Sequence, residues 1–157
     1  MIRQGGKTKP DTLVIDCANG VGAAAAEKLA KYLGSTLPIV LENTDTTTPG
    51  KLNDSCGADY VKTQQKLPPN LVDDMKAGQR ACSLDGDADR LMYYYLDERS
   101  QFQMLDGDKI AALVAAFIVE QVKVAGLDSE IKVGVVQTAY ANGASTKYLV
   151  EVRPKLS

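Results

Sequence analysis

Two short, mostly apolar runs flank an amphipathic stretch near the start of the chain. Residues 12–16 and 38–41 are typical of buried β-strands. The stretch between them predicts a helix, because its apolar residues recur at the spacing of one helix face. These residues are Ala26, Leu29, Ala30 and Leu33. A strand, a helix and a second strand in this order are typical of an α/β domain.

Further strand and helix patterns follow a long polar interval. Residues 43–70 are rich in turn-forming residues and predict a long surface excursion, with one helical turn near residues 58–65. Apolar runs beyond it predict three more strands, and Asp106 can cap the helix that follows them. The predicted elements are strands at 81–84, 91–96 and 101–105, a helix over 110–126, a strand at 131–136 and a helix over 142–150.

The order of these elements divides the chain into three parts. We expect a flexible leader in residues 1–11 and one α/β domain in residues 12–127. Residues 128–157 hold a lone strand and helix after a finished α/β unit, so they are predicted to open a further domain and to end in a divergent tail.

Composition narrows the chemistry that the chain can perform. Its 157 residues include no histidine, which excludes imidazole bases, Ser-His-Asp catalysis and most zinc sites. The net charge of −2 offers no basic surface for nucleic acid, and no apolar run approaches the roughly 20 residues of a membrane helix. Cys17, Cys56 and Cys82 form no CxxC pair, which predicts reduced thiols in a cytoplasmic protein.

The sequence SLDGDADR at residues 83–90 places three carboxylates at alternate positions and then a guanidinium. Because like charges repel at short distance, Asp85, Asp87 and Asp89 either surround a cation or form a solvated turn. The apolar strands on both sides favour a cation, and carboxylate oxygens suit Mg²⁺. An EF-hand is excluded, because Arg90 and Leu96 stand where that loop needs Gly and Glu. A Mg²⁺-dependent sugar phosphatase, with one of the aspartates as its nucleophile, is an alternative.

A second motif lies between the first predicted strand and helix. Gly20, Gly22 and Ala25 match a G-x-G-x-x-A pattern, and Glu42 ends the next strand where a ribose ligand is expected. This pattern predicts a Rossmann-like dinucleotide-binding module as a second alternative. The structural explanation is that the glycines allow a tight turn and close packing of the helix. We favour the structural explanation, since a dinucleotide site leaves the Asp cluster unexplained.

DGDADR at residues 85–90 resembles the metal-binding loop of the α-D-phosphohexomutases, and four more stretches are similar to the phosphoacetylglucosamine mutase branch of that superfamily. In chain order these stretches are VIDCANGVGA, GKLNDSCGADYVKTQQKLP, LDGDKIAAL and VGVVQTAYANGASTKYL. Together they cover nearly all of residues 12–150. The resemblance implies an α/β fold of three layers, with a mixed sheet between flanking helices.

The resemblance also implies an activity. Members of this family are isomerases that interconvert N-acetylglucosamine 6-phosphate and N-acetylglucosamine 1-phosphate for UDP-N-acetylglucosamine synthesis. A phosphoserine on the first of four domains exchanges a phosphoryl group with the sugar through a bisphosphate intermediate. The second domain binds Mg²⁺ through the residues that match Asp85, Asp87 and Asp89 here, and the match places Arg90 near the transferring phosphate.

The departures from the family pattern limit what this chain can do alone. The phosphoserine loop of the family contains histidine, so this chain lacks it, and the sugar-selecting and phosphate-binding loops of the third and fourth domains are also missing. We therefore expect the second domain and the opening of the third, which act on a sugar phosphate together with the other mutase domains in cis. The isolated chain is expected to be inactive and to bind Mg²⁺ weakly, since the phosphoserine ligand is absent.

Overall fold

The computed structural model describes residues 12–152, and the chain divides into two compact units between Met104 and Leu105. The predicted leader, residues 1–11, and residues 153–157 of the predicted tail lie outside the described residues. The predicted domain boundary after residue 127 stays a prediction, because a unit that packs compactly need not be a domain that folds by itself.

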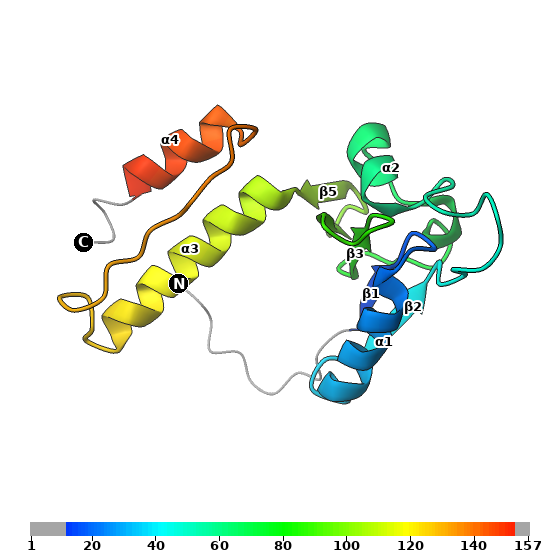
Figure 1. The fold of residues 1–157 in the computed structure, drawn as a ribbon, viewed down its shortest axis with the longest axis horizontal. Helices are drawn as coiled ribbons and strands as arrows, with labels where there is room; N and C mark the ends of the chain where they lie inside the picture. The colour runs from blue at the N-terminus through cyan, green and yellow to red at the C-terminus, as the bar shows by residue number, and fades with distance from the viewer. Residues whose placement is uncertain (1–11, 153–157) are drawn as a thin grey trace. The chain divides into compact units, whose positions relative to one another are not determined.

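A five-stranded mixed sheet forms the centre of the first unit (Figure 1). The sheet order is β2-β1-β3-β4-β5, with β1 parallel to both β2 and β3 and with β4 antiparallel to β3. The register pairs Val14 with Val40 on one side and with Ala81 on the other. The strands are β1 (Leu13–Asp16), β2 (Ile39–Glu42), β3 (Arg80–Leu84), β4 (Leu91–Leu96) and β5 (Phe102–Leu105). The predicted α/β class with a mixed sheet is confirmed.

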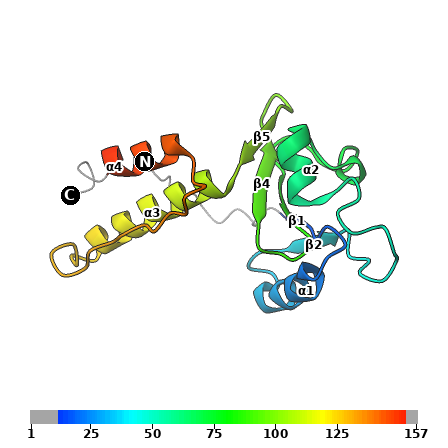
Figure 2. The same ribbon diagram turned by 45° about the horizontal axis from the view of Figure 1, so that its top comes forward.

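Two helices cover opposite faces of this sheet, α1 (Gly22–Leu33) and α2 (Gly57–Gln64), as Figure 2 shows. Successive strand residues point to opposite faces, so β1, β3 and β4 each contribute to two separate cores. Ile15 and Cys82 belong to the core beneath α1, whereas Val14, Ala81 and Tyr94 belong to the core beneath α2. The three layers and the flanking helices therefore follow from the period-two pattern of the strands.

Helix α1 packs through the predicted face, except at one residue. Its buried side chains are Ala23 and Ala26, whereas Leu29, which was expected in the core, is 46% exposed. Ala30 and Leu33, which belong to the same predicted face, are half-buried. Leu29 is therefore a wrong assignment within a correctly predicted helix.

The polar interval between β2 and β3 is more ordered than a surface excursion. The predicted helical turn over 58–65 is α2, and a short 3₁₀ turn, η1 (Pro69–Leu71), follows it. Val61, Leu67, Leu71 and Met75 from this interval are buried against the sheet. Sparse apolar residues in a turn-rich sequence thus supply one whole layer of the first unit.

A fully buried carboxylate, Asp16, joins the strands of this unit to their connecting loops. Its Oδ1 accepts hydrogen bonds from the backbone nitrogen of Ala18 at 3.0 Å and from Nδ2 of Asn43 at 2.8 Å. Its Oδ2 accepts from the backbone nitrogen of Gly57 and from Oγ of Ser83, both at 2.7 Å. Hydrogen bonds from four donors in four segments replace the water that the charged carboxylate loses on burial, and so offset the free-energy cost of desolvation.

The Asp16 network extends to the antiparallel strand β4. The hydroxyl oxygens of Ser83 and Tyr94 lie 2.9 Å apart, and both residues are fully buried. Because the single Ser83 proton is donated to Asp16, the Tyr94 hydroxyl must donate to Ser83. Burial raises the pKa of Tyr94, so this hydroxyl stays protonated. The direction of donation, from Tyr94 to Ser83 and from Ser83 to Asp16, is therefore fixed.

The second unit is a helical pair, α3 (Gly107–Val124) and α4 (Gly143–Val152), which pack together. Asp106 caps α3 as predicted, its carboxylate accepting from the backbone nitrogen of Lys109 at 3.0 Å.

The predicted strand at 131–136 is absent, because no neighbouring strand is available to it among the described residues. Several apolar side chains of α3, Phe117 among them, are exposed. Within residues 12–152, no helix combines the length and the apolar character needed to cross a membrane.

Replacement of the buried carboxylate tests whether Asp16 holds the layers together. In Asp16→Asn the amide nitrogen cannot accept a hydrogen bond, so two of the four donors lose their acceptor in either orientation of the amide. We expect the free energy of unfolding, measured by urea denaturation, to fall by about 3 kcal/mol. Asp73→Asn is the matched control, because Asp73 is exposed, and its effect should stay within about 0.5 kcal/mol. Equal effects of the two variants would contradict the account.

Candidate metal centre

The predicted Asp cluster lies at the carboxyl end of β3, in the turn that leads into β4. The backbone nitrogen of Ala88 donates to the carbonyl oxygen of Asp85 at 3.1 Å, which closes the turn. Ala88 has a φ of 60°, a left-handed conformation that alanine rarely adopts. The turn therefore folds the chain back on itself, and side chains at alternate positions converge.

Three carboxylates meet in this turn. One oxygen from each of Asp85, Asp87 and Asp89 lies within 4.8 Å of the others. Octahedral Mg²⁺ needs ligand oxygens about 3 to 4.2 Å apart, given metal–oxygen distances of about 2.1 Å. Asp85 is buried, whereas Asp87 and Asp89 are exposed and free to rotate by the small amount required. The three predicted residues can therefore hold a divalent cation together.

The charges of the cluster affect one another. The negative charge of Asp87, followed by the hydrogen bond with Asp85, raises the pKa of Asp89 above its usual value. Burial raises the pKa of Asp85, but the hydrogen bonds and the charge of Arg90 outweigh burial and hold this pKa below its usual value. One end of the cluster thus has a permanent counter-charge, while the other end is crowded with like charge that a divalent cation relieves.

Arg90 makes a two-sided ion pair. Its backbone nitrogen and Nε donate to the two carboxylate oxygens of Asp85, at 3.1 and 2.7 Å. Its two terminal nitrogens donate to the two oxygens of Asp59, one of them at 2.8 Å. These hydrogen bonds, the Asp59 bonds first, raise the pKa of Arg90, which is charged at any physiological pH. The guanidinium is half exposed, so it can still meet a ligand.

Asp59 was not predicted as a site residue. It lies in the first turn of α2, and it belongs to the CGADYVK stretch that carried the family resemblance. An acidic residue in the first turn of a helix is common, because it interacts favourably with the helix dipole. The sequence therefore held no signal that Asp59 would meet Arg90, which is 31 residues further along the chain.

The glycine motif after β1 packs against the Asp turn. A Cβ atom at Gly20 would lie 2.3 Å from the carbonyl oxygen of Gly86, and the backbone nitrogen of Val21 donates to that oxygen at 3.0 Å. In a dinucleotide fold these amides face the pyrophosphate. Glu42, the expected ribose ligand, accepts instead from Nδ2 of Asn70 at 3.2 Å. The geometry therefore favours the structural explanation for the glycines.

A phosphatase nucleophile is also poorly served by this geometry. Asp85 is buried and both of its oxygens accept hydrogen bonds from Arg90, which restrict the carboxylate and lower its reactivity as an attacking group. The turn is better suited to binding a cation than to covalent catalysis.

Backbone strain gathers around the same edge of the sheet. Eight non-glycine residues in the described part of the chain have a positive φ, and six of them lie in the loops around the Asp turn. These six are Ala18, Asn19, Asn43, Asn53, Ser55 and Ala88. Strained conformations persist only where surrounding contacts hold them, and they are typical of functional sites.

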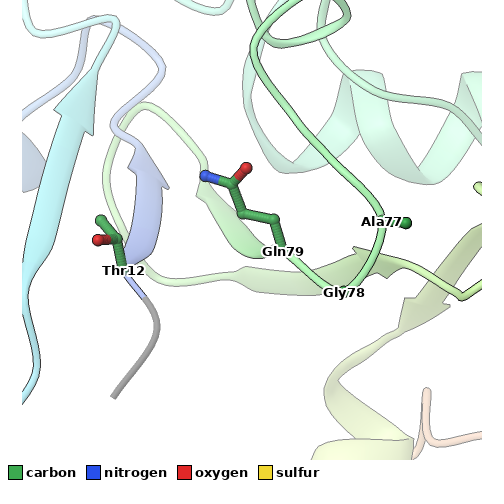
Figure 3. Close-up of a pocket in the computed structure, with 4 residues that line it drawn as sticks. All are labelled: Thr12, Ala77, Gly78 and Gln79. Atoms are coloured by element: carbon green, nitrogen blue, oxygen red, sulfur yellow. The ribbon is translucent and has the colours of Figure 1, made fainter. Parts of the chain in front are cut away.

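Two hollows lie at opposite ends of the strands. One, of about 320 Å³, is lined by Thr12, Ala77, Gly78 and Gln79, which precede β1 and β3 (Figure 3). The other, of about 190 Å³, includes Gly86 of the Asp turn among its lining residues. Ligands of open α/β sheets bind at the carboxyl ends of the strands. The smaller hollow is therefore the one that belongs to the candidate site.

Comparison with known proteins agrees with the fold. Residues 6–92 match the family model "Phosphoacetylglucosamine mutase AMG1, domain II", and residues 106–155 match the model for domain III. The chain is 51% identical over 141 residues to phosphoacetylglucosamine mutase of Sus scrofa, and 51% over 144 residues to phosphoacetylglucosamine mutase 2 of Schizosaccharomyces pombe. These alignments cover 90% and 91% of the chain, but 25% and 26% of the two relatives.

Solved structures give the same result. The chain superposes on Aspergillus fumigatus N-acetylphosphoglucosamine mutase in complex with GlcNAc-6P and magnesium with a TM-score of 0.79 and 49% identity. That match covers 92% of this chain and 29% of the other. A second match, described as a member of the α-D-phosphohexomutase superfamily in a substrate complex, has a TM-score of 0.81 and 43% identity and covers 94% and 28% of the two chains.

The three-layer fold and the acidic turn with its arginine define a domain of the α-D-phosphohexomutase type. Within that class, the chain belongs to the phosphoacetylglucosamine mutase family. It spans about a quarter of the length of the curated relatives that it matches.

The contact between the two loops can be tested at Gly20. In Gly20→Ala the new methyl group meets the backbone of Gly86, so the Asp turn must move. We expect a loss of about 2 kcal/mol in the free energy of unfolding, and amide chemical-shift changes at residues 85–89. Gly107→Ala is the control, because a Cβ atom at Gly107 has no neighbour within 4 Å. Unchanged shifts at residues 85–89 in Gly20→Ala would contradict the packing described here.

Proposed function

We propose that this chain is the metal-binding portion of a phosphoacetylglucosamine mutase. The observation that carries the proposal is the convergence of Asp85, Asp87 and Asp89 beside Arg90, in a domain about half identical to members of that family. The whole protein would interconvert N-acetylglucosamine 6-phosphate and N-acetylglucosamine 1-phosphate. Phosphoryl transfer depends mainly on charge neutralisation and positioning, which a cation and a guanidinium can provide.

We assign Mg²⁺ to the three carboxylates. Their oxygen donors, full charge and spacing suit a hard cation that prefers octahedral coordination. The magnesium complex of the Aspergillus fumigatus relative supports this assignment. When bound, the ion supplies positive charge to the phosphoryl oxygens. Asp85 orients the ligand set, because Arg90 holds its carboxylate in place, while Asp87 and Asp89 adapt to the ion.

We assign Arg90 to the phosphoryl group that is transferred. A guanidinium has five N–H groups, and three of them are used on Asp85 and Asp59. The remaining two are available for phosphoryl oxygens on a side chain that is half exposed. Because guanidinium and phosphate groups match in geometry, Arg90 can bind and orient the phosphate without a change in its own protonation.

The remaining steps belong to other parts of the longer protein. We propose that further mutase domains in cis supply the phosphoserine and the loops that bind the sugar and its second phosphate. In this scheme the chain belongs to the second domain and the opening of the third. The protein is a phosphoprotein of the cytoplasm that serves UDP-N-acetylglucosamine synthesis, and the three free cysteines agree with a reducing compartment.

A chimera tests this function directly. The chain would replace its matching segment in the Aspergillus fumigatus enzyme, and phosphorus NMR would follow N-acetylglucosamine 6-phosphate in the presence of a sugar bisphosphate and Mg²⁺. We expect the chimera to form the 1-phosphate, and Asp87→Asn to lower the rate about a hundredfold or more, because a ligand of the cation is lost. Asp74→Asn, an exposed substitution of the same kind, should leave the rate unchanged.

The isolated chain provides the complementary result. Under the same conditions it should give no new phosphorus signal, since the phosphoserine donor is absent from its sequence. Release of inorganic phosphate by the isolated chain would favour the phosphatase alternative. A folded chimera that forms no 1-phosphate would contradict the proposed function.

A further inference from the structure

Arg90 is adjacent to the very carboxylates that a cation needs. Its Nε lies 3.6 Å from Oδ1 of Asp89 and 2.7 Å from Oδ2 of Asp85. A free guanidinium in this position would rotate toward Asp87 and Asp89, because they carry the exposed negative charge of the turn. It would then neutralise the carboxylates and compete with a divalent cation for their oxygens.

Asp59 prevents that rotation in this structure. Both of its carboxylate oxygens accept from the terminal nitrogens of Arg90, in the paired geometry that fixes the plane of a guanidinium. With those nitrogens engaged, Arg90 reaches Asp85 through its backbone nitrogen and Nε alone. The second lone pair of each Asp85 oxygen is left for a cation.

The position of Asp59 is itself fixed by the contacts of helix α2 with the buried part of the first unit. Asp59 follows Gly57 by two residues in the first turn of α2, and the backbone nitrogen of Gly57 donates to the buried Asp16 carboxylate at 2.7 Å. The buried side chain of Val61 also anchors α2 to the core. Asp59 is therefore held on a rigid element even though its own side chain is exposed.

We propose that Asp59 is a positioning residue that clamps Arg90, and so keeps the carboxylates of Asp87 and Asp89 available to the divalent cation. This inference rests on the proposed function, because it assumes that the turn binds a cation. It assigns a task to a residue outside the DGDADR loop, through an ion pair that spans 31 residues of sequence. Outer partners of this kind commonly tune metal affinity.

A double-mutant cycle on the full 157-residue chain tests the clamp. Mn²⁺, which accepts the same oxygen ligands as Mg²⁺, serves as the probe, and water proton relaxation reports its binding. We expect Asp59→Asn to weaken Mn²⁺ binding about tenfold, because the released guanidinium pairs with the ligand carboxylates. In the Arg90→Gln background the same Asp59→Asn substitution should change the affinity less than about threefold, since only the direct effect of one exposed charge remains.

A second measurement reports the clamp without any metal. Proton–nitrogen NMR of the arginine side chains should show separate, slowly exchanging terminal N–H signals for Arg90 in the wild-type chain, because both terminal nitrogens are held. In Asp59→Asn the chemical shifts of these signals should change, because the terminal nitrogens leave Asp59 for the carboxylates of the turn, while the backbone amide signals of the core residues stay in place. A merely structural effect of the substitution would move the core signals instead.

The outcomes separate the inference from the function on which it rests. Absence of Mn²⁺ binding at the Asp turn of the wild-type chain would overturn both the metal assignment and the clamp. Wild-type binding with an unchanged affinity in Asp59→Asn would overturn the clamp alone. An equal loss with and without Arg90 would also overturn it, because Asp59 would then act as a simple charge.

Discussion

The buried carboxylate of Asp16 is the interaction on which the rest of this structure depends. A charge without water must have hydrogen-bond donors, and its four donors come from the end of β1, the loop after β2, the start of α2 and strand β3. The same carboxylate therefore ties together the carboxyl ends of the parallel strands. From Gly57 the connection continues along α2 to Asp59, then to Arg90, and finally to Asp85 of the Asp turn. The buried charge and the exposed charges thus form one connected system.

This arrangement explains how three like charges can be held close together. Asp85 is stabilised within the protein by Arg90, and Arg90 is stabilised by Asp59, so the inner part of the cluster is compensated before any ion arrives. Asp89 lies further from Arg90, with its Oδ1 at 3.6 Å from Nε, and the charge of Asp87 raises the pKa of Asp89. A cation site needs both properties: ligands that are fixed in space, and negative charge that a cation alone can relieve. The strained backbone at Ala88 is consistent with that requirement, since the turn brings the carboxylates together against their repulsion.

Much of the first unit could be predicted from its sequence because the signals there are local. Apolar runs marked the strands, and alternate carboxylates after a strand marked the turn, whose residues the structure brings together. Three features escaped prediction for reasons that are not local. Leu29 is exposed because the packing of α1 on the sheet, and not the periodicity of its own residues, decides which part of its apolar face is covered. Residues 131–136 form no strand, because a strand requires a neighbour that the pattern of its own residues cannot reveal. Asp59 and Arg90 are 31 residues apart and meet only through the packing of the fold, so no local motif marks Asp59 as a site residue.

An anomalous difference map from crystals of the chain soaked in Mn²⁺ tests whether the Asp turn is the divalent cation site that we propose. We expect a peak bounded by the carboxylates of Asp85, Asp87 and Asp89, with Arg90 still paired to Asp59. A well-ordered turn without a peak between these three carboxylates, at saturating Mn²⁺, would contradict the account.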